Sequence, residues 1–162
     1  THSPVCIGGL DQDGKLVPPD GRIIATLSGI FDHILVEADG AKGMPIKAPA
    51  PYEPVIPSFA THIVGVAGLS SIGQPLFRVC HRAELAAGLL NISPDARVTP
   101  DIIAALICSP DGQYRFAKGR RYSVLLNQAD DDSMIEAGRR TASIIKERLG
   151  CPVVVASLKA ME

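Results

Sequence analysis

The chain has no tryptophan, no long apolar run and no closely spaced pair of cysteines, and each absence excludes a class of protein. No stretch approaches the roughly 18 apolar residues that a membrane-spanning helix requires. The first four residues, THSP, lack the basic start and the apolar run of a secretory signal. The four cysteines are dispersed without a CxxC pair, which is neither a zinc-ribbon spacing nor a disulfide-rich pattern. We therefore expect a cytoplasmic protein with reduced thiols.

An excess of one charge is also lacking, since 16 Lys and Arg residues face 17 Asp and Glu residues and the formal net charge is -1. Because neither sign dominates the long-range field, we expect no nucleic-acid partner and no membrane partner. A small molecule or another protein is the expected partner. The length of 162 residues suffices for one domain with a real core, so we expect residues 1–162 to form a single α/β domain.

Short apolar runs alternate with amphipathic stretches, which is typical of α/β proteins. The later apolar runs are nearly continuous in Val, Ile and Leu, as in strands that helices cover on both faces. The sequence therefore predicts a mostly parallel sheet flanked by helices. The predicted strands are residues 5–7, 34–37, 62–67, 123–126 and 153–156.

The helices between these strands have recognisable ends. Asp20 is the expected N-cap of a helix through Phe31, and Asn91 ends a helix over residues 82–90. Thr99 followed by Pro100 begins a helix through about Cys108. Ser133 and Glu136 have the spacing of a capping box, which predicts the start of a last helix that ends before Gly150.

Two carboxylates follow the apolar run ILV, at Glu37 and Asp39. In open parallel sheets the ligand crevice lies outside the carboxyl ends of the strands. Mg²⁺ prefers one or two carboxylates together with phosphates and waters. We expect Glu37 and Asp39 to hold magnesium and to act in catalysis. The alternative is that the acids cap the next helix and that Asp39-Gly40 forms a turn.

A second polar strand end, LNQAD at residues 126–130, resembles the base-reading N-x-x-D element of GTP-binding proteins. In that element the aspartate accepts from the N1–H and the exocyclic amine of guanine, which adenine cannot supply. We expect Asn127 and Asp130 to contact the base and Ser157 to complete the pocket. Gln128 stands where lysine is usual, which leaves the choice between GTP and ATP open. The alternative is that Asp130 and its acidic neighbours favour the positive end of the following helix.

No G-x-x-x-x-G-K-[S/T] sequence occurs, so the phosphate-binding loop of P-loop proteins is absent from the chain. The chain alone is not expected to hydrolyse a nucleotide efficiently. We expect NTPase activity only if such a loop precedes Thr1.

The run EADGAKGMPIKAP at residues 37–49, followed by YEPVIP at 52–57, is the most specific feature of the sequence. It closely resembles the YqeC-type family of selenium-dependent hydroxylase accessory proteins, also called selenium cofactor biosynthesis proteins. Shorter matches follow in family order over most of the chain: VAGL at 66–69, CHR at 80–82 and LNQAD at 126–130. The resemblance implies a P-loop NTPase-like protein whose phosphate-loop segment is missing, so the domain is expected to be incomplete at its N-terminus.

The resemblance also implies that the crevice beside the magnesium carboxylates meets a phosphate or an anionic selenium or molybdenum species. Lys42 is expected to act there as a catalytic point charge. The expected cofactor-binding residues of the same crevice are Gly40, Lys47, Glu53, His81 and Arg82. The alternative is a rigid proline-rich loop with solvated lysines. Cys80 beside His81 suggests a metal site, but the pair supplies only two ligands.

Three functions are compatible with these features. The first is a Mg-dependent, nucleotide-binding accessory protein for the maturation of selenium-dependent molybdenum hydroxylases. The second is a non-enzymatic module that binds a client hydroxylase or its cofactor and has a vestigial nucleotide site. The third is a transferase acting on a selenium or molybdenum-pterin species.

Overall fold

The computed structural model describes residues 5–10, 12–14, 16–17, 19, 21–115, 117 and 119–159. Contacts divide the chain into two units, Thr1–Glu37 and Ala38–Glu162, which are described separately. In the first unit, β1 (Gly9–Leu10) pairs antiparallel with β2 (Leu16–Val17), and α1 spans Gly21–Leu27. The helix expected up to Phe31 is thus present but shorter, and its expected cap, Asp20, lies outside the described residues.

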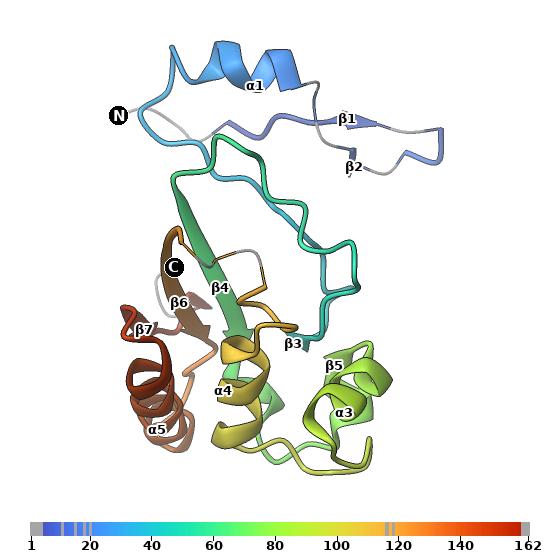
Figure 1. Ribbon diagram of the computed structural model, residues 1–162, viewed down its shortest axis with the longest axis vertical. Coiled ribbons are helices and arrows are strands. Elements are labelled where there is room, and N and C mark those ends of the chain that lie inside the picture. The colour runs from blue at the N-terminus through green and yellow to red at the C-terminus, as the bar shows by residue number, and fades with distance from the viewer. Residues whose placement is uncertain are drawn as a thin grey trace. The chain divides into compact units, whose positions relative to one another are not determined.

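The second unit contains a three-stranded parallel sheet in the order β4-β6-β7 (Figure 1). The strands are β4 (His62–Gly68), β6 (Arg121–Asn127) and β7 (Val153–Val155). All three were predicted from their apolar runs, and the parallel direction is confirmed. Gly68 pairs with Asn127, and Leu126 pairs with Val155, so the three carboxyl ends meet at one edge of the sheet.

A second, very short parallel pair lies beside that edge. It consists of β3 (Ile46–Lys47) and β5 (Cys80–His81). The amide of Gly68 donates to the carbonyl of Pro45 at 2.7 Å. This hydrogen bond places β3 next to the carboxyl end of β4, and with it the loop that carries the most specific sequence run.

Capping residues determine where several helices of the second unit begin and end. The helices are η1 (Leu69–Ser71), α2 (Leu76–Val79), α3 (Ala83–Leu90), α4 (Pro100–Cys108) and α5 (Asp132–Leu149). The Thr99 hydroxyl accepts from the amide of Ile102, and Asn91 ends α3 at φ 53°, as predicted. The predicted Ser133 cap is wrong: the N-cap of α5 is Asp131, whose carboxylate accepts from the amide of Met134 at 2.9 Å. A carboxylate is a strong cap acceptor, and Ser133 donates to it from the first turn.

The core lies between the sheet and helices α4 and α5. Val124 and Leu126 of β6 are buried there with Ile103, Ile107 and Ile145. Side chains that alternate with these along the strands lie on the opposite face. On that face Val64, Val66 and Val154 are 52%, 51% and 55% exposed. The predicted α/β class, with a parallel sheet flanked by helices, is confirmed, but the described helices of this unit leave these three valines about half exposed.

Two predicted strands, residues 5–7 and 34–37, are also wrong. Both segments are irregular, and Leu35 is 97% exposed. In the described part of the chain neither segment pairs with a neighbouring strand. A strand without a partner leaves its backbone groups to water, so apolar composition alone does not produce one.

Candidate functional site

A buried lysine organises the loop around β3. The side chain of Lys47 is 6% exposed, and its ammonium nitrogen lies 3.0 Å from Asp39 Oδ2 and 2.8 Å from Glu53 Oε2. It also donates to the carbonyl of Gly40 at 2.8 Å. A buried charge requires counter-charges and hydrogen bonds of this kind. Lys47 therefore joins the chain segments on both sides of β3.

Glu53 is shared between two cations. Arg82 donates to it from its two terminal guanidinium nitrogens, Nη1 to Oε2 at 2.6 Å and Nη2 to Oε1 at 3.0 Å. The amide of Ala50 donates to Oε2 at 3.2 Å. The Arg82 hydrogen bonds lower the pKa of Glu53 to about 2, against an opposing effect of burial. We call Asp39, Lys47, Glu53 and Arg82 the ion-pair cluster.

His81 and Lys42 lie close to the ion-pair cluster. His81 pairs with Lys47 in the β3–β5 register, and its carbonyl accepts from the amide of Ala48. Burial lowers the pKa of His81, and the positive charges of Arg82, Lys42 and Lys47 lower it further. A lowered pKa favours the neutral imidazole at physiological pH. Lys42 is exposed, in a left-handed turn with φ 51°.

The structure thus brings together seven of the predicted site residues around β3: Asp39, Gly40, Lys42, Lys47, Glu53, His81 and Arg82. The remaining predicted residue of this group, Glu37, is exposed and is the last residue of the first unit.

The three predicted base-side residues meet at the carboxyl ends of β6 and β7. Asn127 Oδ1 accepts from the amide of Leu158 at 3.1 Å, and the Ser157 hydroxyl donates to Asp130 Oδ1 at 2.6 Å. Between these contacts the amide of Ala129 donates to the carbonyl of Ala156 at 3.1 Å. Three hydrogen bonds therefore hold residues 127–130 against residues 156–158, and we call these segments the paired loops.

The profile of a family described as YqeC protein matches residues 1–84, about half of the chain. The chain belongs to the YqeC family. A relative named uncharacterized protein YqeC, from Escherichia coli (strain K12), is 35% identical over 85 residues. These residues cover 52% of this chain and 33% of the relative, so the match spans about a third of the relative's length. No solved structure matches the chain at a significant level.

The YqeC match divides the two groups of site residues. Residues 1–84 include the whole ion-pair cluster, whereas the paired loops lie beyond the matched region. The interpretation of the paired loops depends on their own geometry.

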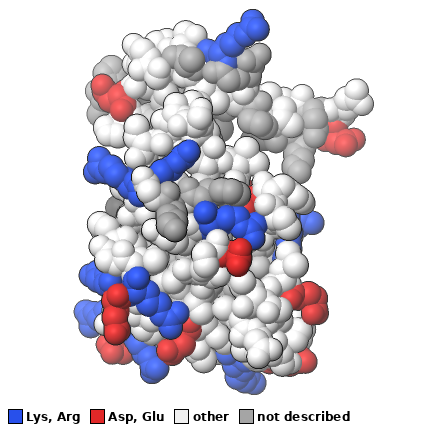
Figure 2. Space-filling view, in the orientation of Figure 1, with Lys and Arg blue, Asp and Glu red and all other residues white. Residues whose placement is uncertain are grey.

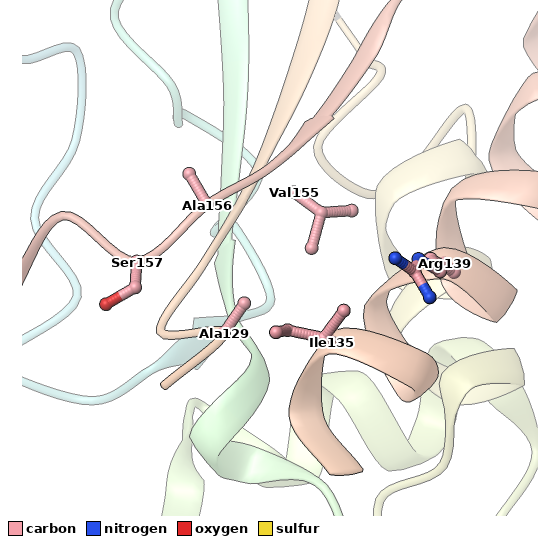
Figure 3. A pocket seen from close by; sticks show the side chains of 6 residues that line it. All are labelled: Ala129, Ile135, Arg139, Val155, Ala156 and Ser157. Carbon is pink, nitrogen blue, oxygen red and sulfur yellow. The ribbon is translucent and has the colours of Figure 1, made fainter. Parts of the chain in front are cut away.

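A small cavity of about 250 Å³ lies beside the paired loops of this YqeC-family chain. Its walls are Ala129, Ile135, Arg139, Val155, Ala156 and Ser157. In Figure 3 the side chains of Ala129, Ile135 and Val155 converge, while the Ser157 hydroxyl points away from them. The cavity is mostly apolar with one cation at its side. The sequence contains no motif from which it could have been predicted.

Two further residues at this edge escaped the sequence interpretation. The Ser70 hydroxyl donates to the side-chain oxygen of Gln128 at 2.6 Å, across 58 positions of the chain. Gly68, the last residue of β4, lies against the side-chain oxygen of Gln128. A glycine at the end of an apolar strand was the available signal, because such a glycine often marks a close approach.

The described residues contain no group of three or more His, Cys, Asp or Glu side chains that could hold a metal ion. Burial also raises the pKa of Cys80 to about 11, which disfavours the thiolate that a metal would require. Asp39 offers a single carboxylate, which already contacts Lys47.

Among the described residues no helix is long and apolar enough to cross a membrane. Both charge signs are interspersed on the face that Figure 2 presents.

Proposed function

We propose that this protein binds a nucleoside triphosphate at the carboxyl edge of the sheet, as an accessory protein for the maturation of selenium-dependent molybdenum hydroxylases. The observation that carries the nucleotide part is the pairing of the loops after β6 and β7 through Asn127, Asp130 and Ser157. Ligands of parallel α/β proteins bind outside the carboxyl ends of neighbouring strands. The maturation role rests on the resemblance in the run at residues 37–57.

Asp130 is the proposed base-reading residue. It is exposed, and Ser157 occupies only its Oδ1 oxygen, so Oδ2 has no hydrogen bond with the described residues. A carboxylate in this position accepts from N1–H and the 2-amino group of guanine. Adenine presents an acceptor at N1 and lacks the 2-amino group, so it leaves Asp130 unpaired. We therefore favour GTP over ATP as the nucleotide.

Magnesium enters the proposal together with the nucleotide phosphates. One carboxylate with phosphate oxygens and waters suits Mg²⁺, and Asp39 is the proposed protein ligand. Asp39 would then exchange its contact with Lys47 for the cation. The exposed Lys42, whose charge acts on His81, is the proposed further positive charge. Because the printed sequence has no phosphate-binding loop, the proposal is nucleotide binding on a P-loop NTPase-like fold, without hydrolysis by this chain alone.

Calorimetric titration of the protein with Mg-GTP, Mg-ATP and Mg-XTP tests the base assignment. Asp130→Asn should weaken Mg-GTP binding roughly 10–100-fold, because the amide presents a donor to the amine of guanine. The same variant should improve Mg-XTP binding, since xanthine has a carbonyl acceptor at that position. Asp132→Asn, an exposed neighbour with the same charge change, is the matched control. The proposal is wrong if the wild type binds no nucleotide, or if the two variants behave alike.

A second proposed function is docking of a client hydroxylase or its cofactor. The observation in its favour concerns the loop that the ion-pair cluster holds in place. In this loop the residues Tyr52 and Val55 are 73% and 69% exposed. Exposed apolar side chains on a braced loop are typical of recognition surfaces. Tyr52→Ser with Val55→Ser should abolish capture of a molybdenum hydroxylase and leave nucleotide affinity unchanged. Elemental analysis of the purified protein tests the third possibility, a bound selenium or molybdenum species.

A further inference from the structure

Gln128 lies within the paired loops, directly after β6, in an unusual backbone conformation. Its backbone has φ 64°, in the left-handed region that side-chain-bearing residues rarely adopt. Hydrogen bonds connect its neighbours to the loop after β7; these neighbours are Asn127, Ala129 and Asp130. The left-handed turn thus sends the backbone of this loop toward β7 and the side chain of Gln128 the other way.

The side chain of Gln128 ends at the carboxyl end of β4. There its oxygen accepts from the Ser70 hydroxyl at 2.6 Å. Gly68 makes room for it: a Cβ at Gly68 would overlap the amide oxygen of Gln128 and lie 2.7 Å from Cβ of Pro45. Gln128 therefore packs against backbone at a place where only glycine fits.

Gly68 is also hydrogen-bonded to the loop around β3. The amide of Gly68 donates to the carbonyl of Pro45, two residues before Lys47. One short contact region thus connects the end of β4 with the paired loops on one side and with the ion-pair cluster on the other. An unfavourable backbone conformation persists where surrounding contacts hold it, and such positions concentrate at functional sites.

We infer that Gln128 and Ser70 are positioning residues for the nucleotide base. They clamp residues 127–130 to the end of β4, so that Asp130 is held in its base-reading orientation before ligand arrives. Neither residue needs to touch the base. The inference rests on the proposed function. It gives a defined role to Gln128, which stands where lysine is usual in the N-x-x-D element.

Four variants test the clamp by titration with Mg-GTP. Ser70→Ala removes the donor and should weaken binding about 5-fold, the effect of one lost hydrogen bond. Gln128→Gly should weaken it similarly without lowering the free energy of unfolding, because glycine adopts φ 64° without strain. The double variant should be no weaker than the single ones, since both remove the same contact. Ser70→Thr keeps the hydroxyl and should retain wild-type affinity, which a purely structural role of this position would not require.

Hydrogen exchange separates failure of this inference from failure of the proposed function. The reporters are the amides of Ala129 and Leu158, whose acceptors belong to the opposite loop. Without nucleotide, Ser70→Ala should speed their exchange about 5-fold, and Ser70→Thr should not. If the wild type binds no nucleotide and the exchange still responds, the clamp stands and the ligand assignment fails. If Ser70→Ala changes neither exchange nor affinity, the inference is overturned.

Discussion

Lys47 shows how one side chain can determine the conformation of a whole loop. A lysine ammonium is strongly hydrated, and removing it from water is unfavourable unless nearby groups replace the water. Three groups do so here: the carboxylates of Asp39 and Glu53 and the carbonyl of Gly40. Because these groups flank β3 on both sides in sequence, satisfying Lys47 closes the loop. A loop closed in this way keeps Tyr52 and Val55 at fixed exposed positions.

Replacing Glu53 by glutamine tests the stabilising role of this cluster. The Glu53→Gln variant removes the charge that Lys47 and Arg82 share and leaves Lys47 with Asp39 as its only carboxylate partner. Breaking a largely buried ion pair from one side is strongly destabilising, and we expect a loss of about 2–4 kcal/mol in the free energy of unfolding. Urea denaturation measures it. Glu136→Gln, whose pair with Arg139 is exposed and 3.9 Å long, should change stability by less than about 0.5 kcal/mol.

The lowered pKa of Glu53 predicts a specific loss of stability in acid. Its pKa is about 2 in the folded chain and 4.5 at the reference value. A carboxyl whose pKa falls on folding stabilises the protein above the unfolded pKa and loses that contribution as the pH falls through the folded value. At pH 3 about 2 kcal/mol of the contribution should be gone. Urea unfolding of the wild type and Glu53→Gln at pH 7, 5, 4 and 3 measures this. A stability difference between them that stays constant to pH 3 would contradict the prediction.

At the scale of elements, α5 and the sheet approach each other unusually closely. Gly138 faces β7, where an added Cβ would lie 2.7 Å from Val155 Cγ1 and 2.8 Å from Leu69 Cδ1. Such distances are shorter than packed side chains permit. The helix therefore depends on a glycine despite the poor helix propensity of this residue. Its close packing on β7 supports the strand whose carboxyl end carries one of the paired loops.

The same substitution in two helices should have opposite effects. Gly138→Ala should lower the free energy of unfolding by about 1–3 kcal/mol, because the overlap outweighs the better propensity of alanine. Gly88→Ala in α3 should raise it by roughly 0.5–1 kcal/mol, because a Cβ there meets open space. Thermal and urea unfolding of both variants measure the difference. Val155→Ala should partly rescue Gly138→Ala, and equal effects of the two alanines would refute the proposed close approach.

The helix ends that the sequence predicted correctly are those whose signals are local. Thr99-Pro100 starts α4 and Asn91 ends α3, because capping depends on residues within one turn. The strand predicted at residues 34–37 failed, because a strand also depends on a partner that may lie anywhere in the chain. The start of α5 failed for a narrower reason: Asp131 and Ser133 are both suitable caps, and a propensity rule does not choose between neighbours.

The sequence predicted which residues belong to the candidate site, but not which of them contact one another. The resemblance in the run at 37–57 identified Asp39, Lys47 and Glu53, yet nothing local shows that the two acids share one lysine. The contact of Ser70 with Gln128 spans 58 positions and depends on the β4–β6 register. Long-range contacts of this kind follow from topology, which a single sequence specifies only through the whole fold.

At the scale of the whole molecule, apolar burial is concentrated in the second unit. Every buried apolar side chain of the described residues lies between Ile46 and Ile145. Residues 31–37, by contrast, are all exposed and include a run of apolar side chains. Among the described residues, the hydrophobic contribution to stability therefore comes mainly from the second unit, and residues 31–37 contribute little of it.

Limited proteolysis with chymotrypsin tests this distribution. Cleavage after Leu35, which is 97% exposed in a segment outside any helix or strand, should precede cleavage after Tyr52, because the ion-pair cluster holds the loop that carries Tyr52. The fragment that begins at Val36 should keep a cooperative unfolding transition within about 1 kcal/mol of the intact chain, since it retains the whole core. Tyr122, buried in β6, is an internal control that should stay uncut until the fragment unfolds. A fragment that loses its cooperative transition would mean that the first 35 residues contribute substantially to the stability of the core.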